Sequence, residues 1–349
     1  MLELAEKKFR EKQYHDAEEI LNRVLNLHSI NSKANELLSY IHGNRGNHYL
    51  AITLLEKATR EVDCSAEAHY YYGKMLLSRS LHRDAIESFK KAIEKAGNFF
   101  EALHEIGTAY AFLEDHQNAL AYYQKCQILK KDSPQLNYNL AKIYEQLKQY
   151  TEANKYYDIA INLDPRYLDA LINKGNLLAE LDRPEDAIKY FNIALKIKSD
   201  CQIFYNKANT LLSLNKYAEA IDCFKRAISI KTHYQEAWTN MGLALQQCNK
   251  NDEAMNCYEQ AIKINDKKVE PLINRGYLYI KLRNFEKAIV DFQKILEIDK
   301  SVNWIYGDLI HTELKLCMWS NLKSKKKLYR KPNKLRTKNN KCIQFLSNQ

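Results

Sequence analysis

Glycine and proline are scarce in this chain, which has nine Gly and five Pro in 349 residues. So few turn-forming residues argue against a fold with many tight β-turns and favour helices. No apolar run approaches the ~20 residues that a membrane-spanning helix needs. The first residues, MLELAEKKFREKQ, are charged throughout and do not resemble a secretory signal. We therefore expect a cytoplasmic protein.

Motifs for metal binding and covalent catalysis are also missing. The eight cysteines contain no C-x-x-C pair, and the ten histidines show no metal-ligand spacing. The chain has no nucleophile elbow and no glycine-rich phosphate loop. We expect reduced thiols, no metal, no cofactor and no catalytic residue, so the chain itself is not predicted to be an enzyme.

The net charge of +10 comes from the end of the chain. Residues 321–349 contain ten Lys or Arg and no Asp or Glu, which leaves residues 1–320 with 43 basic and 43 acidic side chains. The balanced part is a poor match to nucleic acid. Only the basic end could attract nucleic acid or anionic lipid, and then weakly.

What the chain does contain is a repeated element, Ala-x3-aromatic-x2-Ala, whose best-spelled copy lies within Trp238 to Ala261. Some copies are degenerate. The first alanine recurs with a period of about 34 residues, and one step is a single residue shorter. These alanines are Ala17, Ala51, Ala85, Ala119, Ala153, Ala187, Ala220, Ala254 and Ala288. Twelve positions earlier stands a small residue, at Ala5, Ser39, Gly73, Gly107, Ala141, Gly175, Ala208, Gly242 and Gly276.

This period predicts nine helical hairpins, each with a helix A and a helix B. The small residue allows helix A to approach its own helix B, and we expect the aromatic residue to pack into the next unit. One hairpin cannot bury its apolar face alone, so the units must stack. The pattern resembles the tetratricopeptide repeat. The resemblance implies an all-α solenoid, a right-handed superhelix with a groove lined by the A helices, over residues 1–302.

Five consecutive units carry asparagine two positions before the small residue, at Asn139, Asn173, Asn206, Asn240 and Asn274. We call these residues the asparagine row. Asparagine is a mediocre helix former, so its recurrence asks for a reason. Its amide both donates and accepts, and can pair with a peptide bond in both directions. A bland alternative is that asparagine merely suits this slot in such repeats.

The asparagine row resembles the ladder in the repeat domain of O-linked N-acetylglucosamine transferases, which holds the acceptor protein. The resemblance implies a peptide-binding role, and Tyr138 and Tyr205 could stack on ligand side chains. The residues four before the asparagines are Gln135, Asp169, Gln202, Glu236 and Glu270. None is basic, so capture of a carboxylate terminus is disfavoured.

After Ser301 the side-chain pattern departs from the repeat, and residues 303–320 are predicted to form one capping or junction helix. His311, Thr312, Lys315, Cys317 and the Trp319-Ser320 pair resemble the junction before the catalytic domain in bacterial members of that transferase family, although Met318 departs from it. Residues 321–349 are too few for the two nucleotide-sugar-binding lobes.

Two functional hypotheses follow. The first is a scaffold that binds an extended polypeptide in the groove. The second is a truncated or frame-shifted remnant of a transferase that would move N-acetylglucosamine to protein Ser or Thr. On the second hypothesis residues 321–349 are a product of frame-shifting, and on the first they are a disordered basic tail. Assembly with other copies through the outer face is left open.

Overall fold

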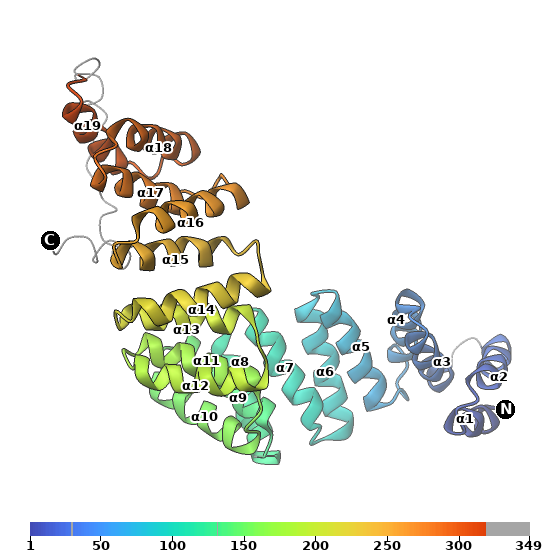
Figure 1. Ribbon diagram of the computed structural model, residues 1–349. Coiled ribbons are helices and arrows are strands. Elements are labelled where there is room, and N and C mark those ends of the chain that lie inside the picture. The colour runs from blue at the N-terminus through green and yellow to red at the C-terminus, as the bar shows by residue number, and fades with distance from the viewer. Residues whose placement is uncertain (29–30, 131, 319–349) are drawn as a thin grey trace. The chain divides into compact units, whose positions relative to one another are not determined.

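The computed structural model describes residues 1–28, 31–130 and 132–318 (Figure 1). This part of the chain is all helical, with nineteen α-helices. Their bounds are α1 Leu2–Arg10, α2 Tyr14–Leu27, α3 Ser32–Asn44, α4 His48–Thr59, α5 Ala66–Ser78, α6 His82–Ala96, α7 Phe100–Phe112, α8 His116–Leu129, α9 Pro134–Gln146, α10 Tyr150–Leu163, α11 Leu168–Glu180, α12 Pro184–Ile197, α13 Cys201–Ser213, α14 Tyr217–Ile230, α15 Gln235–Gln247, α16 Asn251–Ile264, α17 Glu270–Lys281, α18 Phe285–Ile298 and α19 Ile305–Lys315.

The described residues divide into two compact segments, one up to Lys174 and one from Gly175 onward. In the first segment the pairs α1–α2 to α9–α10 each form a hairpin, and each hairpin packs on the next. In the second, α13–α14, α15–α16 and α17–α18 repeat this arrangement, and α19 packs on α18. The predicted all-α solenoid of paired helices is confirmed. The handedness of a superhelix stays a prediction.

Close approach of the two helices explains the small residue of each unit. A Cβ atom placed on Gly242 would lie 2.5 Å from the ring of Tyr258, and one on Gly107 would lie 2.6 Å from the ring of Tyr123. These separations are too short for a carbon side chain, so the ring occupies the space that the glycine leaves open. The aromatic residue therefore packs against helix A of its own unit, and Tyr123 and Tyr157 also interact with Asn139 and Asn173 of the next unit, as the sequence pattern predicts. It is also fully buried, which accounts for much of the core.

The turn between helices A and B recurs with the same backbone conformation. In each of these turns, the residue seven positions after the small residue has a positive φ, which is the left-handed backbone conformation. These residues are Lys12, Gly46, Ser80, Glu114, Lys148, Asp182, Asn215, Asn249 and Arg283. Cys317, one repeat length after Arg283, has φ of 57° at the end of α19. The α19 backbone therefore follows the geometry of an A helix, although Ile310 replaces the small residue.

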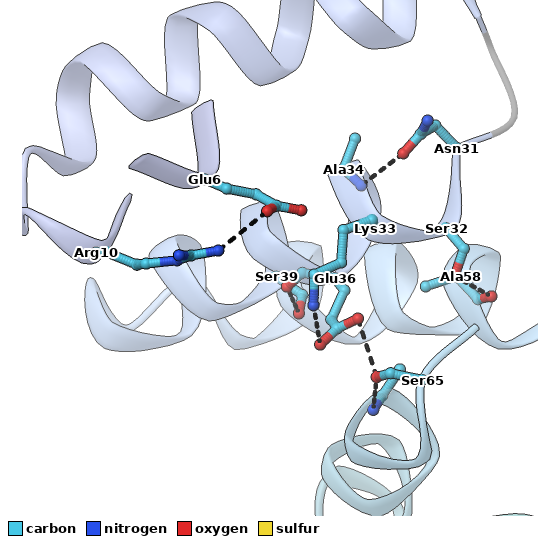
Figure 2. A network of polar contacts seen from close by, with 11 residues as sticks. Glu6, Arg10, Asn31, Ser32, Lys33, Ala34, Glu36, Ser39, Ala58 and Ser65 are labelled. Carbon is cyan, nitrogen blue, oxygen red and sulfur yellow. Dashed lines mark hydrogen bonds and ion pairs between the residues drawn. The ribbon is translucent and has the colours of Figure 1, made fainter. Parts of the chain in front are cut away.

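Polar side chains fix the helix starts and connect neighbouring hairpins near the N-terminus (Figure 2). Asn31 caps α3 by accepting from the backbone N–H of Ala34 at 2.8 Å. Ser65 caps α5, and its hydroxyl donates to Glu36 of α3 at 3.0 Å. Such caps are each worth about 1 kcal/mol because they satisfy donors that the helix leaves unpaired. The Glu36–Ser65 bond links the A helices of two adjacent hairpins.

Two charged pairs are partly or wholly buried between helices. Arg275 of α17 donates to both carboxylate oxygens of Asp291 of α18, at 2.9 and 2.7 Å. Lys174 of α11 pairs with Asp158 of α10. A buried charge depends on its partner, so these pairs specify which helix faces pack together.

Candidate functional site

The asparagine row lies on successive A helices, one residue per helix. Asn139 is on α9, Asn173 on α11, Asn206 on α13, Asn240 on α15 and Asn274 on α17. All five side chains are partly exposed. Four of them are bonded to the A helix of the preceding unit, so the slot also joins neighbouring units. Each such bond contributes about 0.5–1.5 kcal/mol net.

In the first segment the Asn139 side chain has partners on both of its polar atoms. Its Nδ2 lies 3.0 Å from Nε2 of His104 on α7. Its Oδ1 accepts from Gln135 Nε2 at 3.2 Å, and Gln135 Oε1 in turn accepts from the Tyr167 hydroxyl at 2.7 Å. Burial lowers the pKa of His104, which keeps the imidazole neutral and able to accept from Asn139.

Asn173 completes the row in that segment. Its Nδ2 donates to the hydroxyl of Tyr138 at 2.9 Å. The Tyr138 ring lies against the rings of Tyr157 and Tyr167, with centroids 6.1 and 5.2 Å away. Burial raises the pKa of Tyr138, so its hydroxyl stays protonated. Much of this predicted ligand-stacking ring is therefore already in contact with its own chain.

The second segment repeats part of this arrangement two units further along the chain. Gln202 Nε2 donates to Asn206 Oδ1 at 2.8 Å, and Gln202 Oε1 accepts from the Tyr234 hydroxyl at 2.9 Å. Asn206 Nδ2 then donates to Asn176 Oδ1 at 2.9 Å. The Tyr205 ring lies 5.0 Å from the Tyr234 ring, as Tyr138 lies beside Tyr167.

Asn240 has different partners from Asn206. Its Nδ2 donates both to the Tyr205 hydroxyl at 3.2 Å and to Asn209 Oδ1 at 2.9 Å. The residue four before it is Glu236, which is exposed and cannot donate a hydrogen bond when ionised. Within the described residues, Asn240 Oδ1 has no hydrogen-bond partner, and neither polar atom of Asn274 has one.

In the repeat units before and after the asparagine row in the sequence, carboxyl side chains stand at the position that asparagine holds within the row. Glu105 holds it on α7, where burial raises the pKa of its carboxyl and nearby Lys74 opposes that shift. Asp308 holds it on α19, one repeat length after Asn274, and accepts from the Tyr277 hydroxyl at 2.7 Å. Burial and the Asp308 carboxylate raise the pKa of Tyr277.

The sequence pattern identifies the asparagines but not most of their partners. Asn176, Asn209 and Tyr277 lie three positions after row residues, hence on the same helix face, and that spacing could have identified them. From the sequence, Gln135 and Gln202 indicate only that the groove has no basic residue at this position. Asp308 was missed because Ile310 obscures the repeat, although the step of one repeat length from Asn274 marks it.

Other features of the described residues do not form a second site of this kind. Two cavities of about 320 Å³ are present, one beside His69 and Ser88 and one beside Trp238 and Gln260, and no residue of the row lines either. Among residues 1–28, 31–130 and 132–318, no three His, Cys, Asp or Glu side chains gather as metal ligands. In the same residues, no helix combines the length and the apolar character needed to cross a bilayer.

The stacked hairpins and the polar row on their A helices define a helical-repeat protein of the α-solenoid class. Sequence models described as tetratricopeptide repeat match residues 38–99, 100–132, 138–200, 202–234, 236–268 and 269–301. The chain belongs to the tetratricopeptide repeat family, whose members bind peptide or protein partners.

Individual proteins of this kind are similar to parts of the chain. The TPR repeat-containing protein YpiA of Bacillus subtilis (strain 168) is 25% identical over 160 residues, which are 46% of this chain and 38% of YpiA. A tetratricopeptide repeat protein from Parabacteroides merdae shares the fold, with a TM-score of 0.53 and 20% identity, over 71% of this chain and 98% of its own. YrrB, described as having an unusual peptide-binding site, has a TM-score of 0.48 and 21% identity, over 54% and 97%.

The resemblance to the transferase family stays a sequence prediction. It rests on the asparagine row and on the stretch from His311 to Ser320. Residues 319–349, where the truncated-remnant and basic-tail hypotheses differ, lie outside the described residues. The cytoplasmic location and the division at residues 302 and 320 likewise remain predictions.

Proposed function

We propose that this protein is a non-catalytic interaction scaffold that holds an extended polypeptide along its A helices through the asparagine row. The observation that carries the proposal is the unused hydrogen-bonding capacity of the row. Asn240 Oδ1 and both polar atoms of Asn274 have no partner within the described residues, and Asn206 uses only one of its two N–H groups. Partly exposed amides at fixed intervals suit the backbone of an extended chain, which presents N–H and C=O groups regularly.

The bonds between neighbouring units add pre-organisation. Asn206 and Asn240 are held by partners on the preceding A helix, so less side-chain freedom is lost when a ligand binds. Because backbone groups are common to all polypeptides, we expect a row of this kind to tolerate many sequences. Contacts outside the row then set specificity.

The test replaces Asn206, Asn240 and Asn274 together with Ala. The probe is the tightest-binding peptide selected from a random library on the wild-type full chain. Loss of about three hydrogen bonds at about 1 kcal/mol each weakens binding roughly 100-fold. Unchanged affinity, or failure of the library to yield any binder, contradicts the proposal.

A control separates binding from folding, since Asn206 and Asn240 also join repeat units. Gln235→Ala removes a comparable hydrogen bond, from Gln235 Nε2 to the Asn265 carbonyl oxygen at 2.9 Å, away from the row. We expect this variant to bind the probe like the wild type. Circular dichroism of both variants should retain the helical signal.

A further inference from the structure

The hydrogen bonds that Asn206 and Asn240 already make leave these two neighbours with different groups to offer, because only Asn206 still has an unused N–H. Asn206 Oδ1 already accepts from Gln202, which uses one of its two lone pairs, and its Nδ2 uses one hydrogen on Asn176. One N–H of Asn206 is left for a ligand. Asn240 Nδ2 uses both hydrogens, on Tyr205 and Asn209, so that only Oδ1 is left.

We infer that the row has a fixed hydrogen-bond polarity: Asn206 donates to a backbone carbonyl of the bound polypeptide, and Asn240 accepts from a backbone N–H. This inference rests on the proposed function and specifies how that same site reads its ligand. Gln202 is the positioning residue, because its hydrogen bond to Oδ1 fixes the orientation of the Asn206 amide, which keeps an N–H for the ligand, whereas Asn240 has none left.

Other positions of the row agree with this assignment. The Asn139 amide is oriented like that of Asn206, since Gln135 donates to its Oδ1 at 3.2 Å and one N–H is directed to His104, although Asn139 also interacts with the Tyr123 hydroxyl. Asp308, in the same slot on α19, can only accept when ionised, and it accepts from Tyr277. This position of the repeat therefore tolerates a side chain that can accept hydrogen bonds but cannot donate them.

Substitution by Asp separates the two roles because a carboxylate accepts and cannot donate. Asn206→Asp places a carboxylate opposite a ligand carbonyl, and we expect affinity for the library-selected peptide to fall at least about 10-fold. Asn240→Asp keeps the acceptor, and Asn209 can turn its amide to donate to it. We expect the affinity of this variant to stay within about threefold of wild type.

The expected effects of the two substitutions on stability are opposite to their expected effects on peptide binding. The carboxylate of the Asn206→Asp variant would keep the hydrogen bond from Gln202, and Asn176, which now accepts from Asn206, can turn its amide to donate instead. The carboxylate of the Asn240→Asp variant would stand one helical turn after Glu236, and like charges at that spacing are unfavourable. A general loss of stability would therefore harm Asn240→Asp more, which is the reverse of the predicted binding result.

The control for added charge is Asn256→Asp on α16. Asn256 is exposed, and its Oδ1 accepts from Gln260 at 3.3 Å, a bond that a carboxylate retains. We expect this variant to bind the peptide like the wild type. All variants are compared in about 1 M salt, where the Debye length is about 3 Å and long-range attraction is suppressed.

The outcomes distinguish the polarity from the proposed function. If Asn206→Ala and Asn240→Ala both leave affinity unchanged, the proposed function fails. If both alanine variants weaken binding and the two aspartate variants weaken it equally, the row binds peptide but the polarity is wrong. If Asn240→Asp is the weaker binder of the two aspartate variants, the assignment is reversed: Asn240 donates to the ligand and Asn206 accepts from it. Only loss at Asn206→Asp with retention at Asn240→Asp supports the inference.

Discussion

The Arg275–Asp291 pair should show unequal costs when each side is removed. Its two hydrogen bonds, at 2.9 and 2.7 Å, join α17 to α18 within one hairpin. The Arg275 side chain is 19% exposed and that of Asp291 is 3% exposed. Arg275→Ala leaves a carboxylate buried without its charged partner, which costs about 3–5 kcal/mol. Asp291→Ala leaves a guanidinium that has some access to water, and we expect a cost of about 1–3 kcal/mol.

The repeat architecture determines where this loss is observed. Each unit contacts mainly its neighbours, so destabilisation should be largest in α17 and α18 and extend at most to α15, α16 and α19, which pack on them. Hydrogen exchange measured by mass spectrometry should show faster exchange in those helices and unchanged exchange in α13 and α14. Urea titration of the same variants gives the size of the effect.

Replacing both members tests the reasoning about charge. Arg275→Met with Asp291→Leu removes two buried charges together, and such replacements are often neutral or stabilising by about 1–4 kcal/mol. Equal costs for the two alanine variants, or a double variant as unstable as Arg275→Ala, would refute the assignment of the cost to an orphaned carboxylate.

Two further predictions concern the core. Gly242→Val should lower the free energy of unfolding by about 1–3 kcal/mol, because even a single Cβ there lies 2.5 Å from the Tyr258 ring; a wild-type urea midpoint would contradict this. Burial lowers the pKa of His69 to about 4 from an ordinary value near 6.5, so stability should be complete above pH ~6.5 and fall by about 3 kcal/mol as the pH drops to 4. His69→Gln should remove that part of the pH dependence in urea titrations, and an identical slope in both proteins would contradict it.

The repeat made the fold predictable because each unit uses the same few residue types. Gly242 and Tyr258 recur in kind in the other hairpins, so one packing rule applied nine times along the sequence. The rule named only one neighbour of the aromatic ring, the next unit, whereas the ring also fills the space over the small residue of its own helix A. A sequence period does not say which adjacent helices a side chain contacts. The same rule does not extend to α19, because Ile310 stands where the small residue would be, although the α19 backbone has the geometry of an A helix.

The site was only partly predictable. Spacing located the asparagines, but their amide orientation depends on contacts between residues that lie in different repeat units, such as Asn240 with Asn209. Gln202 and Glu236 occupy the same slot and have opposite consequences for the adjacent asparagine. That difference follows from donor chemistry and becomes apparent only once the side chains are placed in space.

The most direct test of the central claim observes the row itself. In the wild-type full chain, isotope-labelled at asparagine, the side-chain amide signals of Asn206, Asn240 and Asn274 are followed by NMR while the library-selected peptide is added. We predict that these three signals shift together along the titration, while that of Asn256 on α16 stays in place. A saturating titration in which the three row signals do not move would contradict the account.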